Sequence, residues 1–556
     1  MKKAILSILL VTVMIFMAAC GSSSSDSSSD KDDSDKSKKQ SSSISYNYVS
    51  PSDLKGDTAS GNASEASPDG SGEQGGNVPD APPDGAGGQG GNGPGGGPGG
   101  GASTQSFDYS GSYSAALSVN GKTKKSDGEK ITSSSTDKNA VLAKSGATLK
   151  LTDATIKKSG DDNNGDNCNF YGLNSSILAV GSKTKAYISD SSIASTSEGS
   201  NGIFSTDSAK VYANNVKIKT TKGNSSRGLD ATYGGIIYGN KLDIDTAKEH
   251  CAALATDRGG GYISVTNSKL KTAGSGSPLI YSTGDIETDN TTGTASGSQI
   301  AGMEGLNRIV INNSTLKSTN DARSGSDPIK NGVILYQSTS GDADTATSEK
   351  AEFQAADSTL KTSISDGAMF YVTNTNAKVF LQNTKLDFDS KKVDLIDAVG
   401  NSNNWGTSGS NGGKVTFTCK DMTISGDIKT DDISSVDLYL KSGTKYTGKT
   451  KGGIGSDNMN VNISKDSTWV VSGDCTVSSL NVAKGGKVED KDGKTITIKK
   501  GSKTLVKGDS DITVTVKGSY STKVKKNSDT NVNADVLDRS AFDKYYKTET
   551  AFGKNN

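Results

Sequence analysis

Short stretches in which hydrophobic and polar residues alternate recur along the chain from about Gln105 onward. Examples are ATLKLTDATIK, AKVYANNVKIKT and GYISVTNSKLKT. Alternation with a period of two buries one row of side chains and leaves the other in water, as in a half-buried β-strand. Gly, Asn, Asp and Ser separate the stretches and favour tight turns. The pattern therefore predicts many short strands joined by turns.

A signature of Asp or Asn, two residues, then Ile or Leu follows these strands. It occurs at Asp153/Ile156, Asp190/Ile193, Asn215/Ile218, Asn267/Leu270, Asn313/Leu316, Asp357/Leu360, Asn383/Leu386 and Asp421/Ile424, with Asn240/Ile244 as a looser copy. An earlier column, aligned on Leu178, Ile203, Leu229, Leu254 and Ile280, has gaps of 25, 26, 25 and 26 residues. Two or three strands in each repeat of about 25 residues predict an all-β parallel β-helix, a solenoid.

The repeats divide this region into three parts. Residues 106–430 are expected to form the main β-helix, and residues 431–526 a Lys-rich end with shorter turns. We expect about 16 turns in all. Residues 527–556 contain LDRSAFDKYYKTET and are expected to be a C-terminal cap, with a short helix covering the open end of the β-helix, or a tail. An array of β-sandwiches is the rival fold, but it would not keep a steady register of about 25 residues.

The first residues predict export and lipidation. Residues 1–19 combine a basic start, an apolar run too short for a comfortable membrane span, and small residues before Cys20. This arrangement resembles the lipobox of bacterial lipoproteins, in which the chain is cut before the cysteine and the cysteine is lipidated. An ordinary secretory signal is the alternative. The resemblance implies an extracytoplasmic protein anchored through Cys20 to the membrane surface.

Residues 20–105 are rich in Ser and Asp and then in Gly and Pro, with almost no apolar side chains. Such a segment cannot bury enough surface to fold, so we expect a disordered linker. The whole chain has 62 basic and 62 acidic residues, which argues against a general nucleic-acid binder. The cysteines after Cys20 are widely spaced, which predicts buried apolar residues without disulfides or a zinc site: Cys168, Cys251, Cys419 and Cys475.

The repeat resembles the pectate-lyase-like superfamily of right-handed parallel β-helices. The stretches ATYGG, ALATDRGGG, SPLIYSTG and FYVTNTNA look like those of a group of adhesin-like or carbohydrate-binding surface lipoproteins from Gram-positive bacteria. The resemblance covers roughly residues 106–430 and implies right-handed coiling. It implies little about function, because this fold hosts lyases, hydrolases, binders and adhesins.

Two arginines and two aspartates are the strongest candidates for a ligand site. Arg227 and Asp230 lie one repeat before Asp257 and Arg258, so all four could share one face. Arginine pairs with carboxylates and aspartates hold Ca²⁺, which would suit an acidic sugar or, if the four converge in a groove, a Ca²⁺-dependent polysaccharide lyase. The alternative is a structural ion pair between neighbouring turns.

A polar loop and the single histidine are the candidates for metal binding. The loop DDNNGDN places oxygens at Asp162, Asn164 and Asp166, the alternate spacing of a Ca²⁺ loop, but the closing Glu of that motif is missing. A plain polar loop is the alternative. His250 is the only histidine of the chain, so it cannot form a typical zinc site with a second one, and we expect a surface histidine.

Repeated tyrosines and a basic stretch are weaker candidates. The tyrosines recur at about the same place in their repeats and could stack sugar rings if they point outward, or pack between turns if they do not: Tyr233, Tyr281, Tyr336 and Tyr371. Residues 484–526 hold 12 Lys against 5 acidic residues, a net charge of +7. This stretch could contact anionic polymers or lipid headgroups, or its lysines could protect strand edges.

These observations predict a lipid-anchored surface protein that mediates adhesion or binds a polysaccharide, including an acidic glycan or a host-surface ligand, without catalysis. A Ca²⁺-dependent lyase, with Ca²⁺ as the candidate cofactor, and a purely structural spacer are the alternatives. The lyase requires the arginines and aspartates to converge in a groove. The binder requires a groove with outward aromatic side chains, and the spacer would leave the tyrosines buried.

Overall fold

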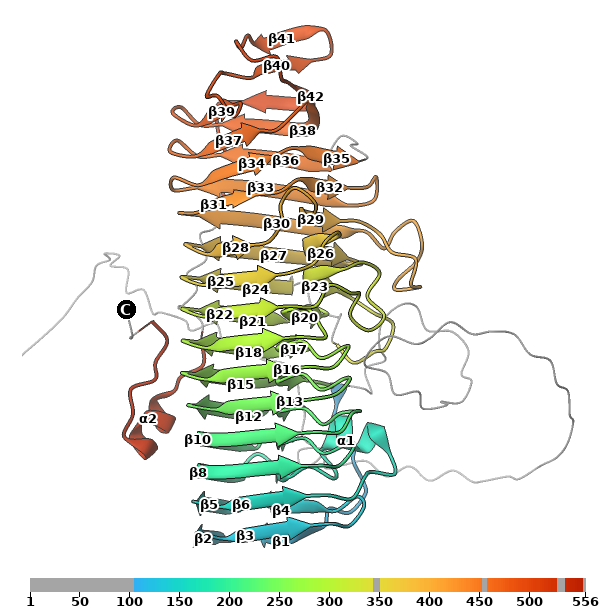
Figure 1. Cartoon of the computed structure of the whole chain (residues 1–556), viewed down its shortest axis with the longest axis vertical. Helices are drawn as coiled ribbons and strands as arrows, with labels where there is room; N and C mark the ends of the chain where they lie inside the picture. The colour runs from blue at the N-terminus through green and yellow to red at the C-terminus, as the bar shows by residue number, and fades with distance from the viewer. Residues whose placement is uncertain (1–104, 344–350, 453–457, 528–535, 554–556) are drawn as a thin grey trace, which may run out of the picture. The chain divides into compact units, whose positions relative to one another are not determined.

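The computed structural model describes residues 105–343, 351–452, 458–527 and 536–553. The expected lipidation site at Cys20, the predicted signal peptide 1–19 and all but the last residue of the predicted linker 20–105 lie outside the described residues. The described strands stack in parallel as a β-solenoid, in which one turn of the chain, here called a coil, carries three short strands (Figure 1). The structure therefore confirms the coarser part of the prediction from the repeats, a parallel β-solenoid.

The first strand of each coil belongs to a 13-stranded sheet, here called sheet A. Its strands are, in order, β1 (Ala115–Asn120), β4 (Asn139–Lys144), β7 (Ile177–Val180), β9 (Ile203–Thr206), β11 (Leu229–Ala231), β14 (Leu254–Thr256), β17 (Ile280–Ser282), β20 (Ala301–Glu304), β23 (Asn331–Tyr336), β26 (Ala368–Thr373), β29 (Asp394–Ala398), β32 (Ile428–Thr430) and β35 (Thr450–Gly452).

The second strands stack beside one another in a second sheet, sheet B. They are β2 (Thr123–Asp127), β5 (Thr148–Thr152), β8 (Lys185–Ser195), β10 (Lys210–Thr220), β12 (Gly235–Asn240), β15 (Gly261–Thr266), β18 (Asp285–Asp289), β21 (Arg308–Asn312), β24 (Ala351–Ala356), β27 (Thr375–Gln382), β30 (Gly413–Lys420), β33 (Ser435–Lys441), β36 (Met459–Ile463), β38 (Cys475–Val482) and β42 (Thr513–Ser521).

The third strands form the remaining face, and β8 and β10 are long enough to supply both second and third strands. The separate third strands are β3 (Lys130–Ser133), β6 (Thr155–Lys158), β13 (Asp243–Thr246), β16 (Lys269–Thr272), β19 (Thr292–Ala295), β22 (Thr315–Ser318), β25 (Thr359–Thr362), β28 (Lys385–Asp387), β31 (Thr423–Ser425), β34 (Lys445–Gly448), β37 (Thr468–Val471) and β39 (Lys487–Glu489). The last four make a separate sheet.

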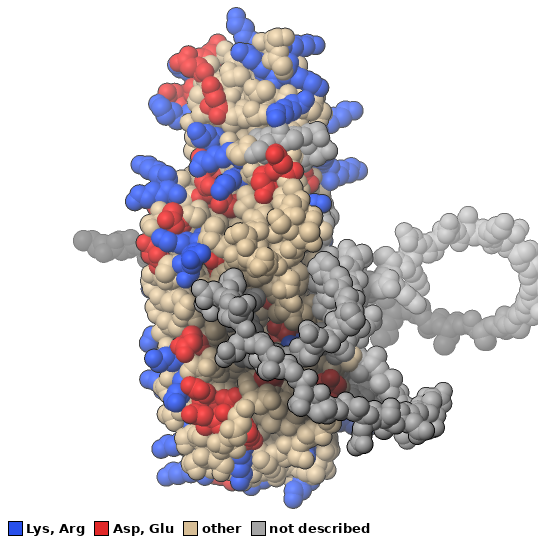
Figure 2. Space-filling model, turned by 90° about the vertical axis from the view of Figure 1, so that its right-hand side faces the viewer, with Lys and Arg blue, Asp and Glu red and all other residues tan. Residues whose placement is uncertain are grey.

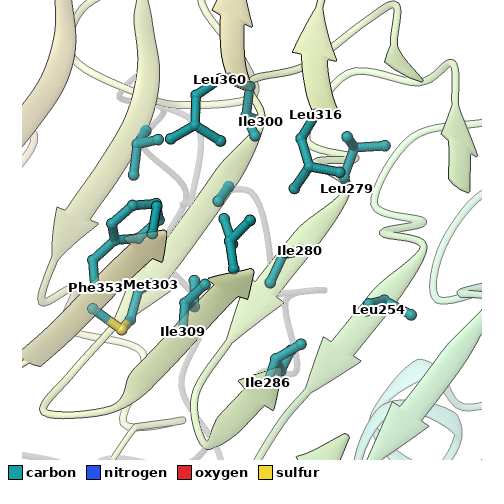
Figure 3. Close-up of a cluster of buried hydrophobic side chains, with 14 of the residues drawn as sticks. Leu254, Leu279, Ile280, Ile286, Ile300, Met303, Ile309, Leu316, Phe353 and Leu360 are labelled. Carbon is teal, nitrogen blue, oxygen red and sulfur yellow. The ribbon is translucent and has the colours of Figure 1, made fainter. Parts of the chain in front are cut away.

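Inward-pointing aliphatic side chains from the three faces meet inside the coils (Figure 3). Ile263, Ile286 and Ile309 occupy the same position in successive coils and are fully buried. Each coil alone has too few of these side chains to form a core, so the stacking of neighbours provides the hydrophobic stabilisation. The shorter repeats near the end are also present, because Val436 pairs with Met459 and Val461 with Leu480, 23 and 19 residues apart.

The alignment of the earlier column is wrong by one residue at its first member. Ile177, and not Leu178, pairs with Ile203 and points inward. Leu178 points outward and packs with Phe170 of helix α1 (Gly165–Tyr171), a helix inserted between β6 and β7. Both residues are apolar because both faces of β7 are covered, so hydrophobicity alone could not fix the register.

The Asp/Asn signature marks a corner between the second and third strands. The corner residue has a positive φ in successive coils, which L-residues other than Asn, Asp and Gly adopt at a cost. The corner residues are Asp153, Asp190, Asn215, Lys241, Asn267, Asn290, Asn313, Asp357, Asn383, Asp421 and Ser442. Three details differ from the sequence pattern: Lys241, next to Asn240, takes the left-handed position, and Asn290 and Ser442 are additional members.

Replacing one corner residue tests this conformational requirement. Asn383 has φ +44° and its amide donates to Asp357 Oδ1 at 2.7 Å. We expect Asn383→Val to lower the free energy of unfolding by about 1–2 kcal/mol, because a β-branched residue is strained there. Asn383→Gly should lose only about 0.5 kcal/mol, since glycine adopts this conformation freely. Urea unfolding of both variants measures the difference, and equal losses would contradict the explanation.

The C-terminal residues form the predicted helix, α2 (Ser540–Tyr546), but the helix does not cover the end of the solenoid. It lies beside β8, β10 and β12 of sheet B, nearer the first coils than the last (Figure 1). The end carries instead an antiparallel pair, β40 (Thr497–Lys500) and β41 (Lys503–Val506). The prediction of a helical end cap is therefore wrong.

Residues 536–553, here called the strap, cover an outward apolar row on sheet B. Tyr187, Tyr212 and Tyr238 stack on one another in successive coils, with ring centroids 4.8 and 5.3 Å apart. Phe542 of α2 is fully buried against this ladder. Phe552 packs further along the same face on a cluster of Val310, Ala356 and Phe380. Covering this apolar surface places the helix on the side of the stack.

The strap also covers charged groups. The backbone N–H of Leu537 donates to both carboxylate oxygens of Glu287 at 3.0 Å. Burial, followed by the nearby Asp285 carboxylate, raises the pKa of Glu287 to about 8 against the opposing effect of Arg308. Arg308 Nη1 lies 3.0 Å from Asp285 Oδ2 and 3.2 Å from Glu287 Oε1. The strap therefore closes over a buried ion cluster as well as an apolar row.

Candidate functional site

The arginine and aspartates proposed from the sequence do meet, but inside the protein. Arg227 Nη1 lies 2.7 Å from Asp230 Oδ2 and 2.9 Å from Asp257 Oδ2. All three side chains are 3% exposed or less. Carboxylates paired in this way with a buried cation cannot bind Ca²⁺ or a sugar without breaking the ion pairs. The geometry fits the structural alternative.

Arg258 turns to a different partner. Its Nε donates to Asp342 Oδ1 at 2.6 Å, and its guanidinium lies 3.6 Å from the centre of the Phe170 ring. Asp342 comes from the long connection after β23, far away in the sequence. Arg258 therefore contacts both α1 and this connection. It does not share one open face with Arg227, Asp230 and Asp257.

The four repeated tyrosines are buried, each 5% exposed or less: Tyr233, Tyr281, Tyr336 and Tyr371. Tyr233 packs against Tyr171 of α1 at 5.6 Å, and Tyr336 stacks on Trp405 at 4.7 Å. The Tyr281 hydroxyl donates to Glu304 Oε2 at 2.9 Å. Of the two alternatives for these tyrosines, the geometry fits packing within the protein, because α1 and the long connections cover the outer face of sheet A.

The polar loop before α1 does not gather its oxygens as a Ca²⁺ loop would. Asn164 Oδ1 caps α1 by accepting from the Asn167 N–H at 3.1 Å. Burial raises the pKa of both Asp162 and Asp166, but Asp162 lies beside Cys168 whereas Asp166 lies nearer Arg258. Among the residues that the structure describes, three or more His, Cys, Asp or Glu side chains nowhere converge in a metal-binding arrangement.

The described cysteines agree with the expectation from their spacing. Each is buried and free of disulfides: Cys168, Cys251, Cys419 and Cys475. Burial raises the pKa of the Cys168 thiol well above its ordinary value and that of Cys251 to about 12. These thiols therefore remain protonated and serve as small apolar side chains.

An open groove follows the corner between the second and third strands. Its volume is about 770 Å³ and it crosses five successive coils. The corner residues Asn313, Asp357, Asn383, Asp421 and Ser442 form one side. Thr315, Thr359, Lys385 and Thr423 begin the third strands and form the other side. Between the two sides lie Ser314, Ser358, Thr384, Met422 and Gly443.

We name this surface the corner groove. Its rows keep register from coil to coil, because Thr315 pairs with Thr359 and Thr359 with Lys385. Hydroxyl, amide, carboxylate and ammonium groups thus repeat at the strand spacing of about 4.8 Å. The Asp/Asn signature in the sequence predicts a turn at this corner. Sequence alone does not show that the surface beside the turn is hollow.

A second cavity lies where the loop before α1 meets the turns of the following coils. Its volume is about 420 Å³, and we name it the α1 cavity. It brings together residues that the sequence suggested separately, Asp162, Arg227 and His250. His250 is a half-buried turn residue with φ +55°. The cavity is completed by Asn163, Gly165, Asn169, Glu198, Asn224 and Ser225.

Charges of both signs are distributed over the face shown in Figure 2. Lysine and arginine side chains gather toward the end formed by the last strands, where the sequence is Lys-rich, and acidic patches lie between them. A single sign of charge does not dominate this face, which fits the balanced composition. Within the described ranges, none of the helices has the length and apolar character needed to cross a membrane.

No family model matches the chain, and neither a curated protein nor a solved structure does. The resemblance to pectate-lyase-like proteins and the right-handed coiling that it implies therefore remain predictions. The fold is carried by the parallel pairing of the strands described above, and the function has to be argued from the grooves and cavities themselves.

Proposed function

We propose that the protein is a surface adhesin that binds a polysaccharide along the corner groove without cleaving it. The observation that carries this proposal is the open, polar groove of about 770 Å³ that repeats over five coils. Apart from Met422 and Gly443, the lining side chains donate hydrogen bonds to hydroxyls or accept them. A repeating surface suits a repeating polymer, because many weak contacts add up without one strong site.

The charges of the groove bear on the class of polymer. Asp357 and Asp421 lie on one side and Lys385 on the other, so the lining is not predominantly basic. This balance favours a neutral or weakly charged glycan over a strongly acidic one, which would need an excess of cations. In this proposal a lipid on Cys20 holds the chain at the outer face of the cell membrane.

The two alternatives fit less well. A lyase on the Arg227 cluster would need groups open to substrate, but Arg227, Asp230 and Asp257 are buried in ion pairs. A right-handed pectate-lyase-like ancestry remains compatible with a binder, since the fold does not dictate the activity. The described lining of the corner groove has no aromatic residue, so the binder proposed here relies on polar contacts and not on the outward rings first expected. A plain spacer agrees with the buried tyrosines but gives no reason for a polar groove kept in register over five coils.

Co-sedimentation with insoluble polysaccharides tests the proposal. The full chain, with Cys20→Ser to remove the expected lipidation site, is mixed with neutral, amino and acidic polymers, the last as a calcium salt. We expect retention on a neutral or weakly charged polymer that stays intact. Thr359→Ala with Lys385→Ala should weaken retention about tenfold, because both contacts in the groove are lost.

The matched control is Thr292→Ala with Lys269→Ala. These residues occupy the same column of the third strands in earlier coils, outside the corner groove. The control should bind like the parent chain. Equal losses in both variants, or no retention on any polymer, would contradict binding in the groove, and release of unsaturated sugars would restore the lyase.

A further inference from the structure

We propose that the α1 cavity is a separate binding site for a sugar that carries a free amino group. The cavity has a volume of about 420 Å³, which lies in the range of small-molecule sites. It is formed by the loop before α1 and by turns of three further coils, at Glu198, Asn224 and His250. It lies away from the corner groove and shares no lining residue with it.

One buried oxygen in the wall of the cavity points to a ligand that donates a hydrogen bond. Asn169 lines the cavity, is 2% exposed, and belongs to α1. Its Oδ1 is buried and accepts no hydrogen bond from the residues that the structure describes. Leaving such an acceptor unpaired costs about 1–3 kcal/mol. A ligand N–H or O–H would remove that cost once a small rotation of the Asn169 side chain turns this oxygen toward the cavity.

The charges in the cavity favour a cation. Arg227 lines it, but its guanidinium is neutralised by two buried carboxylates, Asp230 and Asp257. The remaining charged side chains in the lining are Asp162 and Glu198, both acidic and half-buried. Burial raises the pKa of the Asp162 carboxyl, so a bound cation there would relieve an unfavourable desolvation.

The rest of the lining favours hydroxyl groups. Asn163, Asn224 and Ser225 offer amide and hydroxyl groups, and His250 is the one ring in a lining without aliphatic side chains. An apolar amine would bury its carbon atoms against polar groups and leave those groups without partners. An ammonium surrounded by hydroxyls, as in a deacetylated amino sugar, satisfies both the carboxylates and the polar groups. An ammonium surrounded by hydroxyls occurs both in a free amino sugar and at the end of a deacetylated glycan.

The test uses D-glucosamine and the full chain with Cys20→Ser. Isothermal titration measures its affinity beside glucose, which is close to it in size but lacks the ammonium, and N-acetylglucosamine, in which an acetyl group neutralises the amine and adds bulk. We expect glucosamine to bind at least tenfold more tightly than either. A deacetylated oligosaccharide separates the two sources, because tighter binding than the monomer indicates a chain end and equal binding indicates the free sugar.

Two glutamates give a matched pair of variants. Glu198→Gln should weaken glucosamine binding about tenfold, whereas Glu249→Gln, in the turn next to His250 but outside the cavity lining, should not change it. Equal affinity for glucose and glucosamine, no binding of glucosamine, or equal losses in both variants would overturn the proposal. Thr359→Ala with Lys385→Ala should leave glucosamine binding unchanged, so this site and the corner groove are tested independently.

Discussion

Replacing Arg227 with methionine is expected to lower the free energy of unfolding by about 3–5 kcal/mol. The side chain is 2% exposed and its Nη1 bridges Asp230 and Asp257 at 2.7 and 2.9 Å. Methionine fills much of the space but carries no charge, so two carboxylates would remain buried without their cation. That uncompensated charge, and not lost packing, is the expected source of the loss.

Urea unfolding at neutral pH measures this effect, and two further variants identify its cause. Lys222→Met removes an ion pair whose members, Lys222 and Asp161, are nearly half exposed, and it should cost less than about 1 kcal/mol. Adding Asp230→Asn and Asp257→Asn to Arg227→Met should recover much of the stability, because the unpaired charges disappear. Without such recovery, the loss would have to be assigned to packing.

The repeat could be predicted because it rests on local chemistry. A corner at positive φ selects Asn or Asp at nearly every coil, and an inward position selects an aliphatic residue three positions later. The coil at Asn290 shows the limit of this reasoning. There the inward position is Gly293, and a Leu279 side chain from the same coil fills the space that the missing side chain leaves. A search for the paired signature passes over such a coil.

The site could not be predicted to the same extent, because sequence does not show what covers a face. The tyrosines that recur with the repeat are buried by α1 and by long connections. A second tyrosine row, at Tyr187, Tyr212 and Tyr238, has gaps of 25 and 26 residues and was equally visible. Its burial depends on a segment some 300 residues later in the chain. Such long-range cover is a property of tertiary packing and leaves no local pattern.

The Arg227 cluster is a second site whose burial could not be predicted from the sequence. The repeat period correctly brings Asp230 and Asp257 to neighbouring coils, so their proximity follows from the sequence. Whether they face water depends on α1 and on the connection that carries Asp342, which pairs with Arg258. The α1 cavity arises from the same inserted elements. Insertions therefore determine where ligands can reach, whereas the repeat determines only the scaffold.

Arg539→Met is expected to detach the strap from sheet B. Arg539 is 2% exposed, and burial lowers the pKa of its guanidinium to about 10. Its Nη1 donates to the Ser264 carbonyl at 2.7 Å, its Nη2 to the Gly239 carbonyl at 2.8 Å, and its Nε to Thr550 Oγ1 at 2.9 Å. Methionine would leave both carbonyls buried without these donors, at a cost of about 1–3 kcal/mol each.

Hydrogen exchange of residues 536–553 measures the detachment directly, and Lys544→Met on the exposed side of α2 is the matched control. We expect Arg539→Met to raise exchange throughout the strap, while Lys544→Met leaves it unchanged. Unaltered protection in Arg539→Met would mean that Phe542 and Phe552 hold the strap without the arginine. If the coils beneath keep their own protection, the strap is a cover that opens separately. If protection of β12 and β15 is lost with it, the strap is part of the cooperative unit that stabilises the solenoid.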